Sequence, residues 1–128
     1  MAVRIVRLGS ERKPGEGLRI GTVHRPPRGV PKEKFSSQNW YDTWLPNLAP
    51  SAEAIALAHH AKTPAQWRAF FNAYRAEMAR PENVHLITTL ALLSQQTDFS
   101  VGCYCEDESH CHRSVLRELL QKHGAKVV

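Results

Sequence analysis

The sequence predicts an α/β fold: a single domain over residues 1–128, with a small, mainly parallel sheet flanked by helices. Segments 3–8 and 18–24 have the alternating apolar residues that are typical of short strands. The middle of the chain carries large apolar residues at helical spacing. The last third reads as strand, loop, helix and strand, and two strands joined by a helix are normally parallel.

The segments between the first strands are irregular. Residues 9–17 are polar and loop-like. Three prolines within residues 25–31 remove backbone donors, so this rigid basic segment is neither a helix nor a central strand. Three aromatic side chains within residues 39–45 are in contact range on a helical turn, so we expect a short helix that Pro46 closes.

Three longer helices follow. Ser51 can cap a helix that runs to about His60. The clearest start is the capping box of residues 63–66, which has a proline in the first turn. Another helix should cover residues 81–95, although the two threonines at 88–89 leave a strand as an alternative. The apolar stripe of the middle helix is expected to face the core and consists of Trp67, Phe70, Phe71, Tyr74 and Met78.

The end of the chain predicts a strand at about 100–105, a helix at 112–123 that Gly124 stops, and a last strand at 125–128. The polar loop between the first strand and the helix then projects from the carboxyl edge of the sheet. The basic loop at 25–31 projects from the same edge if the second strand is parallel. The two loops could therefore converge.

Composition bounds the function. The chain of 128 residues carries a formal net charge of +5, which favours acidic partners in general. Its basic residues are scattered and no aromatic RNA-binding motif accompanies them, so nucleic acid is only an alternative partner. No apolar run approaches the ~20 residues that span a bilayer, and the N-terminus lacks the apolar core of a secretory signal. We therefore expect a cytoplasmic protein without a membrane partner.

All three cysteines and two of the seven histidines lie within residues 103–114. In a first interpretation, Arg113 and the free backbone N–H groups of the helix start, joined by Arg25 or Arg28, bind a phosphate or carboxylate, helped by the helix dipole. Cys111 then lies beside positive charge, which lowers a thiol pKa and favours a nucleophile. The acidic run at 106–108 opposes anion binding unless it points outward.

Two other interpretations stay open. In the second, the three cysteines and either His110 or His112 bind zinc, whose preferred ligands are thiolates and imidazoles. The Cys-x-Cys pair at 103–105 is tighter than usual ligand pairs and the Cys-His pair at 111–112 is adjacent, so we predict no stoichiometric zinc. In the third, Cys103 and Cys105 are small core residues, His112 caps locally and Arg113 makes a structural salt bridge.

The last third of the chain holds Cys-Tyr-Cys-Glu at 103–106, an acidic spacer, Cys-His-Arg-Ser at 111–114 and the amphipathic helix that follows. This pattern resembles the bacterial and archaeal domain of unknown function 488 family. The segments at 17–20, 25–33 and 44–51 are similar to its YeaO-like branch, and so are the later residues Trp67, Phe70, Tyr74 and Glu77. This resemblance covers most of the chain. It implies a compact α/β fold and no established activity.

Together these observations predict a protein that binds a small anionic molecule and is a candidate cysteine-dependent enzyme. The alternatives are a zinc-stabilised domain and a basic nucleic-acid-associated protein. We expect no metal and no other cofactor, and the oligomeric state is not predicted. The catalytic candidates are Cys111 and His112, and the ligand-binding candidates are Arg113, Ser114, Arg25 and Arg28.

Overall fold

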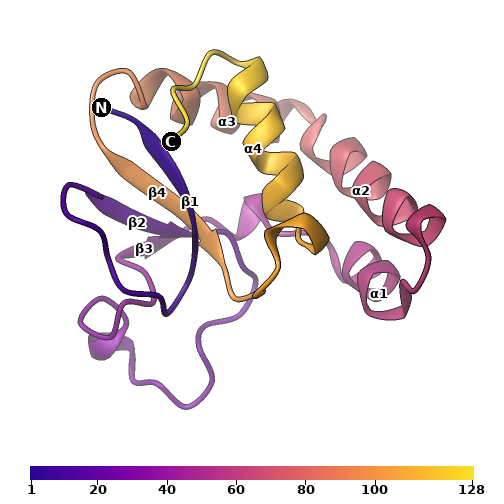
Figure 1. The fold of residues 1–128 in the computed structure, drawn as a ribbon, viewed down its shortest axis with the longest axis horizontal. Coiled ribbons are helices and arrows are strands. Elements are labelled where there is room, and N and C mark those ends of the chain that lie inside the picture. The colour runs from indigo at the N-terminus through magenta and orange to yellow at the C-terminus, as the bar shows by residue number, and fades with distance from the viewer.

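Four parallel strands form one sheet in the order β1-β4-β2-β3 in a computed structural model that describes residues 1–128 (Figure 1). Although β4 comes last in the chain, it lies between the first two strands and pairs with both. The predicted α/β class and parallel sheet are confirmed. The strands are β1 (Val3–Arg7), β2 (Leu18–Gly21), β3 (Thr43–Trp44) and β4 (Phe99–Cys103).

Four α-helices lie on one side of this sheet (Figure 1). As expected, Ser51 caps the first, and Thr63 and Gln66 form a complete capping box at the start of the second. The third is helical through residues 88–89, which excludes the strand alternative. None of the helices has the length and apolar composition to cross a membrane. They are α1 (Ala52–His60), α2 (Pro64–Met78), α3 (Pro81–Leu93) and α4 (His112–Lys122).

The helix expected at residues 39–45 is wrong. Asn39 adopts a φ of 64°, and the following backbone pairs with β2 instead of forming a helical turn. The Asp42 N–H donates to the Arg19 carbonyl and the Leu45 N–H to the Gly21 carbonyl, both at 2.8 Å. The sheet therefore uses the donors that a helix needs, and long-range pairing overrides the local aromatic spacing.

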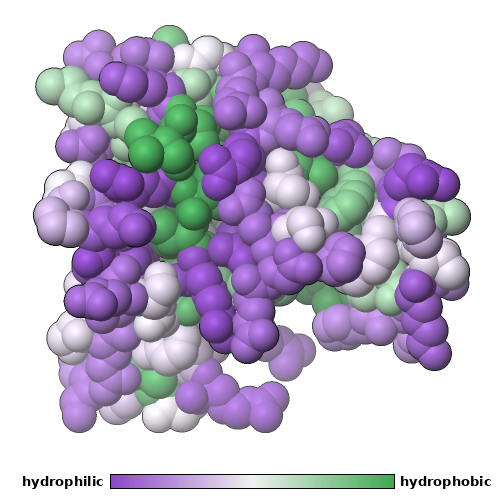
Figure 2. All heavy atoms as spheres, viewed as in Figure 1, coloured by the Kyte–Doolittle hydropathy of each residue, from purple (hydrophilic) through white to green (hydrophobic).

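The ends of other predicted strands also differ. The second strand stops at Gly21 rather than continuing to residue 24. The last strand, expected at 125–128, is reduced to a single bridge between Val3 and Val127 on the outer side of β1. Figure 2 shows a largely hydrophilic surface with an apolar band near this chain end, where Val128 is exposed.

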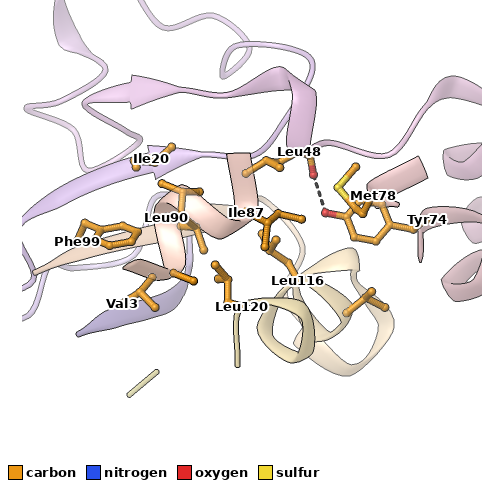
Figure 3. Packing of buried hydrophobic residues seen from close by; sticks show 13 residues of the cluster. Val3, Ile20, Leu48, Tyr74, Met78, Ile87, Leu90, Phe99, Leu116 and Leu120 are labelled. Atoms are coloured by element: carbon orange, nitrogen blue, oxygen red, sulfur yellow. Dashed lines mark hydrogen bonds between the residues drawn. The ribbon is translucent and has the colours of Figure 1, made fainter. Parts of the chain in front are cut away.

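The main core fills the space between the sheet and the helices (Figure 3). Because side chains alternate along a strand, Phe99 and Val101 of β4 face the helices together with Ile20 of β2. Tyr74 of the predicted stripe is fully buried, and its hydroxyl donates to the Leu48 carbonyl at 2.7 Å. Of the five stripe residues, three are buried and two are partly buried, as a core-facing stripe requires.

The opposite face of the sheet is covered by the loops at 9–17 and 35–42 instead of helices. A side chain on Gly21 would reach within 2.6 Å of the Tyr41 ring, so this loop packs directly on the strand. Arg19 of β2 is 0% exposed on this face and pairs with Glu16, with 2.7 Å between its Nε and the carboxylate. A buried ion pair thus holds the loop side of the sheet.

Candidate functional site

The carboxyl ends of the parallel strands meet at one rim, and the start of α4 lies above that rim. Alternation along β4 places Cys103 on the helix-facing side, in line with Phe99 and Val101. Thr22 follows β2 at the neighbouring position, and its N–H donates to the Gly102 carbonyl. Cys111 is the N-cap of α4, so strand ends and helix start bring these groups together.

His112 is held in one tautomer by the backbone around it. Its Nε2 lies 3.0 Å from the Thr22 carbonyl, which can only accept, so Nε2 carries a proton. The same Nε2 lies 3.1 Å from the Thr22 hydroxyl, which in turn donates to the Gly102 carbonyl at 2.9 Å. The other ring nitrogen, Nδ1, faces the Cys111 Sγ at 3.6 Å. A neutral His112 can therefore accept the thiol proton.

The three thiols form a cluster around this pair. The Sγ atoms of Cys103 and Cys105 are 3.6 Å apart, and no disulfide joins any of them. Hydrogen bonds from the Cys103 and Cys105 thiols, and then the contact with the His112 ring, lower the pKa of the Cys111 thiol although burial opposes this shift. Hydrogen bonds to Cys105 and Cys111 raise the pKa of Cys103. Among the three thiols, these hydrogen bonds therefore favour ionisation of Cys111 over ionisation of Cys103.

The cysteines differ in exposure. Cys111 is 1% exposed and Cys103 is 6% exposed, whereas Cys105 is exposed on the loop. The Tyr74 ring packs edge-on against His112, with 5.2 Å between the ring centroids. The Cys-His pair therefore lies under the surface, with one exposed thiol beside it.

Arg113 and Ser114 donate hydrogen bonds to backbone carbonyls of the loop at 105–111. Arg113 is 3% exposed, and one of its terminal nitrogens donates to the Cys105 carbonyl at 2.6 Å. Its Nε is buried without a hydrogen-bond partner. The Ser114 hydroxyl donates to the Cys111 carbonyl at 3.0 Å. Neither residue lines the cleft that holds the other two predicted arginines.

The loop between the cysteines is fastened to two helices. His110 stacks on Trp67 of α2, with ring centroids 4.4 Å apart and planes 11° from parallel. Glu108 accepts from the Arg117 guanidinium of α4 at 2.7 and 3.0 Å. Asp107 caps the single turn at the loop centre through Ser109.

Arg117 stands six positions after Cys111, which is the spacing expected of a cysteine-dependent phosphatase. For such a site to hold a phosphate, the residues between the cysteine and the arginine would have to form a loop whose backbone N–H groups are free to donate. Here residues 112–117 are helical, which commits backbone N–H groups beyond the first turn to the helix, and Arg117 is paired with Glu108. The structure therefore forms no such phosphate loop.

Arg25 and Arg28 lie across the rim, in a cleft of about 660 Å³. Both are exposed, and no ion pair engages either of them. Arg7 from the end of β1 is the third arginine of the cleft. The remaining lining residues are Leu8, Gly9, Ser10, Pro26, Pro27, Trp40 and Tyr104.

Tyr104 connects the cleft to the thiol cluster. Its hydroxyl donates to the Arg25 carbonyl at 2.8 Å, while its own carbonyl accepts from the Arg7 Nε at 3.2 Å. Tyr104 stands between Cys103 and Cys105 in the chain, so cleft and cysteines share one backbone segment.

Thr22, Tyr104 and Arg7 are site residues that the sequence analysis missed. For Thr22 the signal is its position two residues after Ile20, which places both on the helix-facing side of β2 as the strand reaches the rim. Arg7 ends β1 in the same way. The aromatic contacts of Tyr104 depend on the path of the loop and carry no local signal.

Residues 3–124 match the family described as the active DUF488-N3 subclade. The chain belongs to the domain of unknown function 488 family. The resemblance seen in the Cys-His-Arg motif is therefore confirmed, and the YeaO-like placement within the family stays a prediction. No curated protein and no solved structure matches this family member.

Proposed function

We propose that this protein is a cysteine-dependent enzyme for a small anionic substrate, with Cys111 as the nucleophile and His112 as its general base. The observation that carries the proposal is the hydrogen-bond chain from Gly102 through Thr22 to His112. It fixes the proton on Nε2 and turns the free Nδ1 lone pair to the thiol. A nucleophile, a base and a group that orients the base are the recurring parts of such sites.

The chemical step follows from this arrangement. Nδ1 of His112 takes the Cys111 proton, and the thiolate forms a bond to the electrophilic atom of the substrate. The bond to the leaving group breaks, and the imidazolium returns its proton to that group. Water then releases the product from sulfur with the same base. Thiol donors from Cys103 and Cys105 favour the thiolate form before attack.

Access requires movement, because Cys111 is 1% exposed. In this proposal the loop at 105–110 moves aside to admit substrate, and its exposed Cys105 marks the side from which substrate enters. The net charge of +5 draws anions to the molecule, and the family description names an active subclade.

Thiol mapping in a Cys105→Ser background tests the proposal, since the exposed thiol no longer competes for the reagent. With limiting iodoacetamide, Cys111 should be labelled faster than Cys103, and labelling should persist below pH 7. His112→Gln should slow the labelling of Cys111 at least about tenfold. Thr22→Val should slow it less, because it removes one of two acceptors of Nε2–H.

Thr89→Val is the matched control. The Thr89 hydroxyl donates only within α3, far from the cysteines in the chain, so its loss should leave the labelling rate unchanged. The proposal fails if Cys111 remains unlabelled until the protein unfolds, or if His112→Gln leaves its rate unchanged.

A metal centre is the second candidate, because the cluster fits zinc better than its sequence spacing suggests. The ligand atoms of Cys103, Cys111 and His112 all lie within 4.8 Å of one another. A tetrahedron with Zn–S bonds of ~2.3 Å and Zn–N bonds of ~2.0 Å has edges of roughly 3.5–3.8 Å. Within this group, the 3.6 Å from Cys111 Sγ to His112 Nδ1 matches such an edge, and Cys105, 3.6 Å from Cys103, offers a further thiol beside the group.

The contact between His112 Nε2–H and the Thr22 carbonyl is also the outer contact that orients metal-bound histidines. Native mass spectrometry after dialysis against zinc separates the two candidates. One zinc per chain, with all three thiols protected from iodoacetamide, would show that the cluster is a metal centre and would rule out Cys111 as the nucleophile. A metal-free protein whose Cys111 reacts supports the enzyme.

A further inference from the structure

The cleft beside the thiol cluster has a strong and poorly compensated positive charge. Arg7, Arg25 and Arg28 line it, and the only carboxylate paired with any of them is Glu106, at 3.5 Å from Arg7. Both members of that pair are largely exposed, so the pair contributes little. Guanidinium groups match the oxygen pairs of phosphate in a planar, bidentate geometry.

The arginines are held on a stiff frame. Pro26 and Pro27 stand between Arg25 and Arg28 and fix two φ angles of the loop. The Tyr104 hydroxyl holds the Arg25 carbonyl, and the Tyr104 carbonyl holds Arg7. Such a frame fixes the backbone positions from which the three side chains reach one ligand group.

One wall of the cleft is aromatic. The Trp40 and Tyr104 rings meet edge to face with centroids 6.0 Å apart, and both line the cleft. Gly9 lets the Trp40 ring approach the backbone, since a Cβ there would lie 2.8 Å from the ring. Half-buried aromatic rings beside cations are the usual partners of planar bases, which stack on them.

From this combination we infer that the cleft binds a phosphorylated aromatic metabolite, with a nucleoside monophosphate as its typical form. The phosphate contacts the three arginines, and the base packs against Trp40 and Tyr104. A volume of about 660 Å³ lies within the range of small-molecule sites. The inference rests on the proposed function in one respect: it names the substrate class of the proposed cysteine-dependent enzyme.

Calorimetric titration of the full chain at physiological salt tests this with three probes. Adenosine 5′-monophosphate carries both recognition groups, ribose 5-phosphate lacks the base, and adenosine lacks the phosphate. We expect the nucleotide to bind at least about tenfold more tightly than either fragment. Arg28→Ala should weaken nucleotide binding about tenfold, and Arg68→Ala, an exposed arginine on α2, should leave it unchanged.

Three results would overturn the inference. They are equal affinity for ribose 5-phosphate and the nucleotide, equal losses in Arg28→Ala and Arg68→Ala, and no saturable binding of any probe. Repeating the titration with Cys111→Ser separates this inference from the proposed function. Binding that persists in this variant supports the cleft whatever the thiol does, while iodoacetamide rates test the thiol without ligand.

Discussion

The two faces of the sheet differ in what covers them, with helices on one side and, on the other, loops that bury an ion pair beside the Tyr41 ring. The helix side is apolar, with Val101 and Leu116 completely buried between β4 and α4. The loop side instead buries Arg19 and Glu16 under irregular chain. Apolar burial stabilises whatever its exact partners, while a buried ion pair requires every donor to be satisfied.

Arg19 meets that requirement by holding two loops. Its guanidinium pairs with Glu16 and also donates to the carbonyls of Ser10 and Asn39, at 2.9 and 2.8 Å. These loops carry Ser10 and Trp40, which line the arginine cleft. The comparison teaches that the helix side supplies stability, whereas the polar side positions the walls of the candidate ligand site.

The largest expected effect comes from breaking the buried pair. Arg19→Met leaves Glu16 charged in a site where it is 2% exposed, and we expect a loss of about 4 kcal/mol in the free energy of unfolding. Urea denaturation at neutral pH measures it. The matched control is Arg75→Met, which breaks the exposed pair with Glu118 and should cost about 1 kcal/mol or less. Equal losses would mean that burial does not matter for this pair.

The apolar face should respond to a cavity. Leu116→Ala removes a side chain that is 0% exposed, and we expect a loss of about 3 kcal/mol in the free energy of unfolding. Leu92→Ala makes the same change at a position that is 64% exposed and should cost much less. Because no charge is involved, the Leu116 loss should be the same at pH 7 and pH 5. A pH-dependent loss would contradict the contrast between the faces.

The smallest effect is an acid sensitivity of the polar face. Burial alone would raise the pKa of Asp42, but hydrogen bonds from Arg12, the Arg19 backbone and Ser36 lower it from 3.8 to about 2. A depressed carboxylate pKa stabilises the fold above the unfolded value, and this contribution is lost as the pH falls from about 4 to about 2. Glu16, whose pKa is also lowered, acts in the same direction.

Thermal melts between pH 5 and pH 2 check this expectation. Asp42→Asn should flatten the acid-induced fall in melting temperature, and Glu11→Gln, at an exposed carboxylate without an ion pair, should not. If the melting temperature falls with pH as steeply in Asp42→Asn as in the wild type, Asp42 is not the source of the acid sensitivity.

Local signals predicted most of the fold. The capping box, the apolar stripe and the alternation of the first strand carry their information within a few residues, and all three are confirmed. The helix predicted at 39–45 does not form, because the conformation of this segment depends on Gly21, whose missing side chain leaves room for the Tyr41 ring. Nothing within the segment itself records that contact.

The candidate site was likewise predicted only in part. The sequence placed Cys111 and His112 together at a helix start, where they lie. It expected Arg113 to join Arg25 and Arg28, but Arg113 turns inward to the Cys105 carbonyl. Side-chain direction at a helix start depends on the loop that packs above it, and spacing along the chain does not encode that packing.

The stacking of His110 on Trp67 has a kinetic consequence. Since the loop is fastened there and at Glu108, we expect covalent labelling of Cys111 to proceed through openings of residues 105–110. The observed rate is then the product of an opening equilibrium and the intrinsic rate of the thiolate. Trp67→Leu should raise the first factor alone, so the ratio of its labelling rate to that of the wild type would measure how much the Trp67–His110 stack adds to the free energy of opening.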